Sequence, residues 1–199
     1  ETLFMSHIEP LERGALPEFE PLFDLVEASM GFVPNSFLTM ARWPELLQSF
    51  SNYAGTVMNS GEVSTELKQL VAFVVSQSAG CRYCQAHTSH GAEKKGITAE
   101  KIAAAFEFET SPLFDAAEKA ALALALHAGM VPNAAEPAHF EALKDHFSER
   151  QIVEIVAVLA LFGSLNRWND TLATMLEDEP TTFATSTLQN HGWTLGKHG

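Results

Sequence analysis

The amino-acid sequence predicts an all-α protein, folded as a single compact helical domain with an internal helix-turn-helix pseudo-repeat. Two observations predict the helices. Apolar residues recur at spacings of three and four, and no segment shows the sustained alternation of a half-buried strand. The similarity of two segments of the chain predicts the repeat. With 199 residues, 46% of them hydrophobic, the chain has the composition of an ordinary globular domain.

Capping residues, prolines and glycines predict where each helix begins and ends. Thr98 and Ser148 are expected N-caps, with Gln151 completing a capping box, and Ser111 is expected to cap a helix that begins at Pro112. The predicted helices span residues 18–30, 44–59, 65–79, 81–95, 99–107, 112–129, 136–146, 149–164 and 166–177.

The chain divides into an extended arm, one helical domain and a tail. Pro and Gly residues within 1–17 indicate an extended arm, and 18–180 forms the domain. The tail spans 181–199, and its end, QNHGWTLGKHG, reads as irregular, with Trp193 packing against the rest of the protein.

Charge and hydropathy exclude several classes of partner. With 25 acidic and 12 basic residues, the net charge of −13 argues against nucleic acid and against anionic membrane surfaces. The apolar stretch Ile155 to Leu165 is shorter than the roughly 18 residues that span a bilayer. The start, ETLFMSHIEP, has no basic, apolar leader. We therefore expect a cytoplasmic protein.

The pseudo-repeat pairs a first copy at about 64–95 with a degenerate second copy at about 148–177. QLVAFVVSQSAGCRYCQA aligns without a gap on EIVAVLALFGSLNRWNDT, so that CRYC falls on NRWN. An arginine followed by an aromatic residue is kept inside both turns. We infer a duplication that kept its chemistry in the first copy only.

Cys81 and Cys84, the only cysteines, are the candidate reactive pair. Gly80 ends the preceding helix, so both thiols lie in the first turn of the next one. There the helix dipole and Arg82 favour the thiolate form. Residues three apart on a helix are neighbours, so the pair can close a disulfide during a catalytic cycle. In a reducing compartment such a pair is more often catalytic or metal-binding than structural.

His87 is the candidate acid/base group. It lies about 60° around the helix from Cys84, whereas His90 points almost opposite to Cys81. A histidine beside a thiolate can accept its proton and deliver it to a leaving oxygen.

The stretch KQLVAFVVSQSAGCRYCQAH resembles the core motif of the alkylhydroperoxidase D-like group in the carboxymuconolactone decarboxylase superfamily. The resemblance implies an all-α fold, a homo-oligomer, often a trimer or a multiple of it, and no cofactor. It implies reduction of a hydroperoxide by the cysteine pair, which a dithiol donor then restores.

Two positions depart from the motif. The family's glutamate position, twelve residues before the first cysteine, holds Gln69, and its histidine position holds Thr88, with His87 one residue earlier. Gln69 and Tyr83 are expected to shape the pocket. Glu154, which aligns with Gln69 in the second copy, is an alternative source of the missing carboxylate.

The expected reaction is attack of one thiolate on the terminal oxygen of a hydroperoxide, followed by resolution of the sulfenic acid by the other thiol. Which cysteine attacks stays open. The alternatives are a redox sensor or structural oligomer without turnover, a zinc protein, and a lactone decarboxylase. Zinc would use Cys81, Cys84, His87 and His90, whose directions fan around one helix, so we assign no metal.

Overall fold

The computed structural model describes residues 6–199 and is all-α, as predicted; no strand occurs in this range. Residues 1–5 of the predicted arm lie outside the described residues. The α-helices are α1 (Glu20–Met30), α2 (Asn35–Met40), α3 (Pro44–Asn59), α4 (Thr65–Ser78), α5 (Arg82–Lys94), α6 (Ala99–Ala104), α7 (Ala116–Ala128), α8 (Pro137–Lys144), α9 (Glu149–Leu172) and α10 (Asp178–Leu188). Short 3₁₀ turns occupy Pro17–Phe19, Ala105–Glu107, Gln189–His191 and Gly196–His198.

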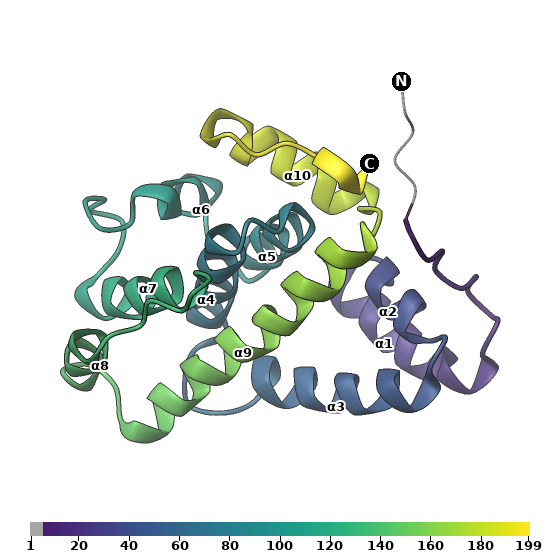
Figure 1. Ribbon diagram of the computed structural model, residues 1–199, viewed down its shortest axis with the longest axis horizontal. Helices are drawn as coiled ribbons and strands as arrows, with labels where there is room; N and C mark the ends of the chain where they lie inside the picture. The colour runs from purple at the N-terminus through teal and green to yellow at the C-terminus, as the bar shows by residue number, and fades with distance from the viewer. Residues whose placement is uncertain (1–5) are drawn as a thin grey trace.

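Helix α4 forms the centre of the core. Its residues from Leu70 to Val75 are almost completely buried, because α5, α7 and α9 pack around it. A helix that is apolar on nearly all sides is expected to be enclosed in this way. α9 runs diagonally across the molecule, and α10 lies over α5 (Figure 1).

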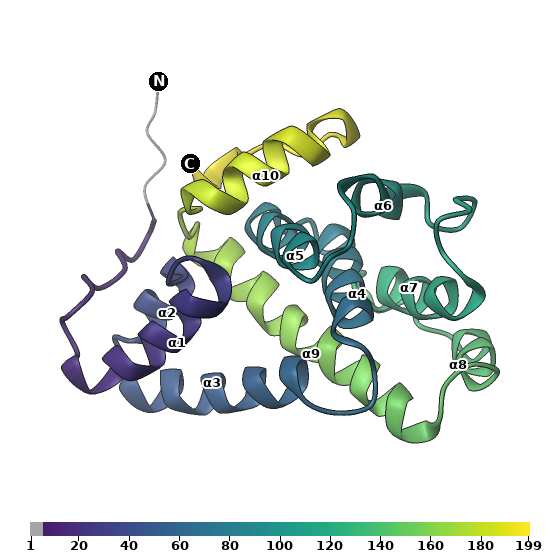
Figure 2. The ribbon, with the colours of Figure 1, turned by 180° about the vertical axis from the view of Figure 1, so that it is seen from behind.

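A second, smaller core lies on the other side of α9. It joins α1, α2 and α3 through Phe19, Phe23, Met40, Ala41 and Leu47. Viewed from behind, α1 to α3 form one side of the molecule and α6 to α8 the other (Figure 2). α9 therefore contributes to both halves of the protein.

The prediction of a second helix-turn-helix is wrong, because α9 continues without a break through residues 149–172. In the first copy, Gly80 adopts a φ of +77° and allows the chain to turn between α4 and α5. The aligned residue of the second copy is Leu165, which disfavours that conformation. The helix therefore continues where the first copy turns.

Three other local predictions need correction. α7 begins after Asp115, which forms a capping box with Glu118, and not at Pro112. The short helix α2 was not predicted at all. The helix α10 was not predicted either, and it extends to Leu188, inside the predicted tail at 181–199. The predicted caps Thr98 and Ser148 are confirmed, and Trp193 is buried as expected.

Within the described residues, α9 is the one helix long and apolar enough to cross a membrane by length and composition. About half of its most apolar window, 44%, is buried inside the protein. A core helix passes the same test, and α9 packs against α3, α4, α5, α7 and α8. Its apolar character is thus accounted for by the core.

Glu154 of α9 holds the loop between α3 and α4. Its carboxylate accepts hydrogen bonds from the backbone N–H groups of Glu62 and Val63, at 2.9 to 3.0 Å. It also lies 3.5 Å from the ammonium of Lys68, whose side chain is 1% exposed, and 2.8 Å from Arg150. Burial raises the pKa of Glu154, but the Val63 amide, Arg150, the Glu62 amide and Lys68 together lower it to about 2.

Replacement Glu154→Gln is expected to lower the free energy of unfolding at neutral pH by about 3 kcal/mol, because it leaves the buried Lys68 without its counter-charge. The folded-state pKa lies below the ordinary 4.5, so the carboxylate stabilises the wild type above about pH 4.5 and loses this effect as the pH falls towards 2. Urea titrations across this range measure both effects.

The exposed carboxylate of Glu141 on α8 provides the control. Glu141→Gln is expected to change the free energy of unfolding by less than about 0.5 kcal/mol. Equal stability of the Glu154 and Glu141 variants would contradict the assigned role.

Candidate active site

Cys81 and Cys84 lie at the start of α5, as the sequence predicts. After the turn at Gly80, the Cys81 N–H donates to the Ser76 carbonyl at 3.1 Å, and Cys81 becomes the N-cap of α5. Its Sγ accepts a hydrogen bond from the Cys84 N–H at 3.3 Å. Both thiols are free and buried, with relative exposures of 0% and 2%. The turn thus brings two thiols together at one helix end.

The surroundings of the pair are mostly apolar. Leu165 and Leu176 pack against the cysteines and Tyr83. One polar neighbour is Asn169 of α9, whose Nδ2 donates to the Cys84 Sγ at 3.5 Å. Asn169 aligns with Cys84 in the predicted repeat. Corresponding positions of the two segments therefore meet in the site, although the second segment has no turn.

The environment of Cys81 favours the neutral thiol at rest. The Cys84 side chain, burial and the Asp170 carboxylate all raise the pKa of Cys81, and they outweigh the lowering effect of the Cys84 backbone N–H. The helix end alone therefore does not give a stable thiolate. A reaction at Cys81 requires a nearby group that accepts its proton.

Asp170 and His198 lie beside Cys81. The Cys81 Sγ, an Asp170 oxygen and a His198 ring nitrogen all lie within 4.8 Å of one another. The His198 Nε2 is 3.1 Å from the Asp170 Oδ1, and Lys197 Nζ is 3.8 Å from the same oxygen. Asp170 belongs to the end of α9 and His198 to the tail. Sequence reasoning missed both, because only the fold brings these segments to α5.

These three groups are of types that bind metals, and they are the one such cluster found among residues 6–199. The four zinc ligands considered from the sequence are not gathered around one point. His87 pairs with Glu177, and the His90 ring nitrogen lies 3.9 Å from Glu179.

His87 belongs to a second polar network. Its Nε2 is 2.5 Å from the Glu177 Oε2, and its ring stacks on Tyr83 with centroids 4.3 Å apart. The Tyr83 hydroxyl donates to the Glu177 Oε1 at 2.9 Å, and the Asn35 N–H also donates to that oxygen. No hydrogen bond within residues 6–199 joins His87 to a thiol, so its role as their base stays a prediction.

Charges in this network reinforce one another. Burial raises the pKa of Glu177, but the charge of His87 and its hydrogen bond, with that from Asn35, lower it below the ordinary value. Burial and the Glu177 charge raise the pKa of Tyr83 well above 10, so its hydroxyl stays a donor. The network links α5 to the start of α10 and to Asn35.

Gln69 and Glu154 lie away from the pair in this structure. Gln69 faces Gly91, where an added Cβ would lie 2.9 Å from the Gln69 Oε1. Glu154 is engaged at the α3–α4 loop, as described above. At the family's histidine position, the Thr88 hydroxyl donates to the Cys84 carbonyl at 2.7 Å. None of these groups contacts a thiol through the hydrogen bonds described.

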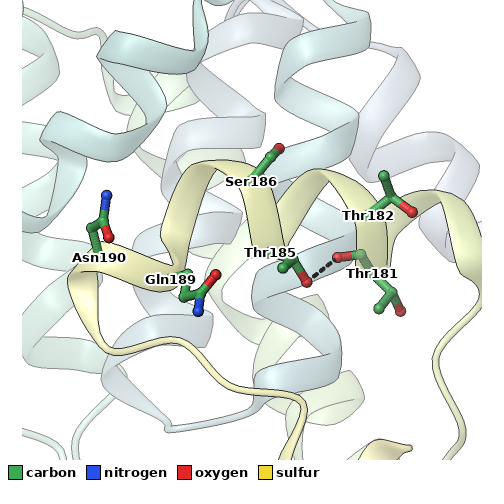
Figure 3. Close-up of a pocket in the computed structure, with 6 residues that line it drawn as sticks. All are labelled: Thr181, Thr182, Thr185, Ser186, Gln189 and Asn190. Atoms are coloured by element: carbon green, nitrogen blue, oxygen red, sulfur yellow. Dashed lines mark hydrogen bonds between the residues drawn. The ribbon is translucent and has the colours of Figure 1, made fainter.

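Two hollows on the surface lie elsewhere. One of about 460 Å³ lies on α10 and is lined by hydroxyl and amide side chains, Thr181, Thr182, Thr185, Ser186, Gln189 and Asn190 (Figure 3). Another, of about 410 Å³, lies between α7 and α8 and includes Lys119, Asp145 and His146. Neither contains a cysteine. Because both thiols are almost completely buried, a substrate reaches them only if the groups that cover them move.

The all-helical fold and the buried C-x-x-C pair define a class of thiol-containing helical proteins, and comparison with known proteins identifies its family. The carboxymuconolactone decarboxylase family matches residues 44–127. The debrominase Bmp8 is 36% identical, with a TM-score of 0.85 over 94% of this chain and 98% of its own. A cysteine-to-alanine variant of Bmp8 in complex with 2,3,4-tribromopyrrole gives a TM-score of 0.86 over 90% and 96%, also at 36% identity. The chain belongs to the carboxymuconolactone decarboxylase family.

Two further relatives support this assignment. A peroxidase-related protein from Ralstonia eutropha JMP134, described as an alkylhydroperoxidase AhpD core, is 27% identical, with a TM-score of 0.76 over 90% of this chain and 95% of its own. The uncharacterized protein YdfG of Bacillus subtilis is 29% identical over 109 residues, which are 54% of this chain and 71% of YdfG. The predicted family and the alkylhydroperoxidase D-like fold are therefore confirmed.

Replacement Tyr83→Phe is expected to lower the free energy of unfolding by about 1.5 to 3 kcal/mol, because it removes a buried hydrogen bond to the charged Glu177. Chemical denaturation at neutral pH measures the loss.

Tyr53, the other tyrosine, is the matched control. Its side chain is exposed, and its hydroxyl lies 3.5 Å from the Ala157 carbonyl. Tyr53→Phe is expected to change stability by less than about 0.5 kcal/mol. Equal losses in the two variants would show that the Glu177 network does not contribute as described.

Proposed function

We propose that this protein is a thiol-dependent reductase that cycles Cys81 and Cys84 between dithiol and disulfide. The observation that carries the proposal is the contact of 3.3 Å between the Cys84 N–H and the Cys81 Sγ, with both thiols free in a buried helix end. Residues three apart in the first helical turn are close enough to form a disulfide after a small adjustment. The pair can therefore deliver two electrons to a bound substrate.

The first candidate substrate is a hydroperoxide, in a peroxidase reaction. One thiolate attacks the terminal oxygen, the S–O bond forms as the O–O bond breaks, and the alkoxide leaves with a proton as an alcohol. The second thiol attacks the sulfenic sulfur, the S–S bond forms, and the hydroxyl leaves as water. A dithiol donor then restores both thiols by exchange. This chemistry needs no cofactor.

The second candidate is reductive removal of a halogen from an aromatic ring. The 36% identity to the debrominase Bmp8 over most of both chains favours it. The balance is the same: an aryl bromide and two thiols give the arene, bromide, a proton and the disulfide. The apolar surroundings of Cys81 and Cys84, with Leu165 and Leu176, suit a flat apolar substrate.

Other chemistries have less support. A lactone decarboxylase of this family acts without thiols, so a buried C-x-x-C pair argues against it. A redox sensor would have the same cysteine pair but no turnover. A zinc site on Cys81 would compete with disulfide formation.

We also propose that the chain forms a homo-oligomer, as its family resemblance implies. The predicted apolar face of α7 is largely covered within the chain, because Ala121, Leu122, Leu124 and Ala125 are buried. On α9, Val153 and Val156 remain 65% and 40% exposed, one helical turn apart. A second copy of the chain would cover this stripe.

Light scattering at micromolar concentration is expected to give a multiple of 21.7 kDa, with a trimer or a multiple of it as the family expectation. Val153→Glu is expected to reduce the mass of the assembly. A monomeric wild-type protein would contradict this part of the proposal.

The reaction itself is tested by a turnover assay with dithiothreitol as donor and with cumene hydroperoxide or 2,3,4-tribromopyrrole as substrate. Cys81→Ser and Cys84→Ser are each expected to reduce turnover by a factor on the order of a hundred or more, because either change prevents the disulfide. Alcohol formation identifies a peroxidase, and bromide release identifies a dehalogenase.

Ser186→Ala, in the hollow on α10, is the control and is expected to retain full activity. Turnover of either substrate that persists in both cysteine variants would overturn the proposed cycle. Absence of turnover with both substrates, while peroxide still forms the disulfide, would favour the sensor.

A further inference from the structure

The segment from Trp193 to His198 closes over the start of α5. The Trp193 Nε1 donates to the Arg82 carbonyl at 3.1 Å, and the Arg82 Nη1 donates to the Gly192 carbonyl at 3.1 Å. The Leu176 N–H donates to the His198 carbonyl at 2.8 Å. These contacts hold the His198 ring, which is 1% exposed, beside Cys81.

Both nitrogens of the His198 ring face oxygen acceptors. The Nδ1 is 2.8 Å from the Thr174 carbonyl, which can only accept a hydrogen bond. The Nε2 is 3.1 Å from the Asp170 Oδ1. A neutral imidazole carries a proton on one nitrogen only, so it would place a lone pair against one of these oxygens. An imidazolium, with a proton on each nitrogen, donates to both oxygens.

The charge of Asp170 agrees with this requirement. Burial raises its pKa, but the hydrogen bond from His198 and the charge of Lys197 lower it below the ordinary value. Asp170 is thus an ionised acceptor at neutral pH, and it cannot donate to His198. The geometry points to an imidazolium and carboxylate pair within 4.8 Å of the Cys81 Sγ.

We propose that His198, as an imidazolium, is the positioning residue that acts on Cys81 through Asp170. In this arrangement Asp170 accepts the thiol proton, and the positive ring lowers the cost of negative charge on the sulfur. The inference deepens the proposed function and rests on it for the reaction step. It assigns to the tail the relay role that the family motif places on a glutamate and a histidine.

The protons balance in the hydroperoxide reaction. The Cys81 S–H proton passes to Asp170 as the S–O bond forms and the O–O bond breaks. The leaving alkoxide then takes one proton from the Asp170 and His198 pair. The pair gains one proton and loses one, so it ends as it began.

The groups around the ring favour a proton over a divalent metal. On the tail itself, Lys197 places its ammonium 3.8 Å from the Asp170 Oδ1 and donates to the Asp170 carbonyl. From α5, Cys81 and the ring of Tyr83, 5.9 Å away between centroids, face His198. From the α9–α10 connection it meets a carbonyl. The lysine adds a positive charge close to the Asp170 carboxylate, which disfavours a second cation beside it.

The test measures alkylation of Cys81 by iodoacetamide as a function of pH, in a Cys84→Ser background so that one thiol reacts. His198→Gln is expected to reduce the rate about ten-fold near neutral pH, relative to its own rate near pH 10, because loss of the ring charge moves the thiolate to higher pH by about one unit. A merely structural role would alter the rates equally at all pH values.

His191→Gln is the matched control, because His191 lies in the same tail and stacks on Phe106 away from the thiols. It is expected to leave the profile unchanged. Histidine ¹⁵N NMR provides a readout that needs no folded variant: both His198 ring nitrogens are expected to carry protons at neutral pH. A neutral tautomer, or an unchanged pH profile in folded His198→Gln, would overturn the inference.

Stoichiometric zinc in the purified protein, with faster alkylation after chelation, would also overturn it and would make the cluster a metal site. The inference and the proposed function fail separately. A His198-dependent alkylation profile without turnover refutes the reductase alone, whereas cysteine-dependent turnover with an unchanged profile refutes the relay alone.

Discussion

The hydrogen bond from the Cys84 N–H to the Cys81 Sγ depends on the turn at Gly80, and the rest of the site depends on that turn. A residue with a side chain disfavours the φ of +77°. If α4 continued through this point, as α9 does in the second copy, Cys81 would lie inside a helix. The Cys84 N–H would then donate to a carbonyl within the helix, and the Cys81 sulfur would lose this hydrogen bond. The turn places Cys81 and Cys84 together in the first turn of α5.

The groups that complete the site come from distant segments. α9 crosses the molecule and ends beside α5, so Asn169 reaches Cys84 and Asp170 reaches Cys81. The tail then returns along α10 and places His198 on Asp170 (Figure 1). Glu177, at the start of α10, binds the side chains of Tyr83 and His87. The end of α9, the start of α10 and the tail thus meet at the first turn of α5, and none of the three lies in the family's motif.

The all-helical fold, the capping residues and the position of the cysteines could be predicted from the sequence, because periodicity, N-caps and Gly80 are local signals. The repeat alignment did not predict that α9 continues, because it took no account of Leu165 standing where the first copy has Gly80. Asp170 and His198 lie 89 and 117 residues beyond Cys81, and no spacing rule joins them. Glu154 illustrates the converse, since its alignment with Gln69 suggested a place near the thiols, whereas it binds the α3–α4 loop.

The most direct test of the two-electron cycle is a single turnover without donor. The reduced protein, which has two cysteines per chain, is mixed with a small excess of hydroperoxide or brominated pyrrole, and thiols and product are counted after denaturation. The cycle predicts that each chain consumes one substrate molecule and loses both thiols, and that the chain becomes lighter by two hydrogens. Product formation with both thiols intact would contradict it.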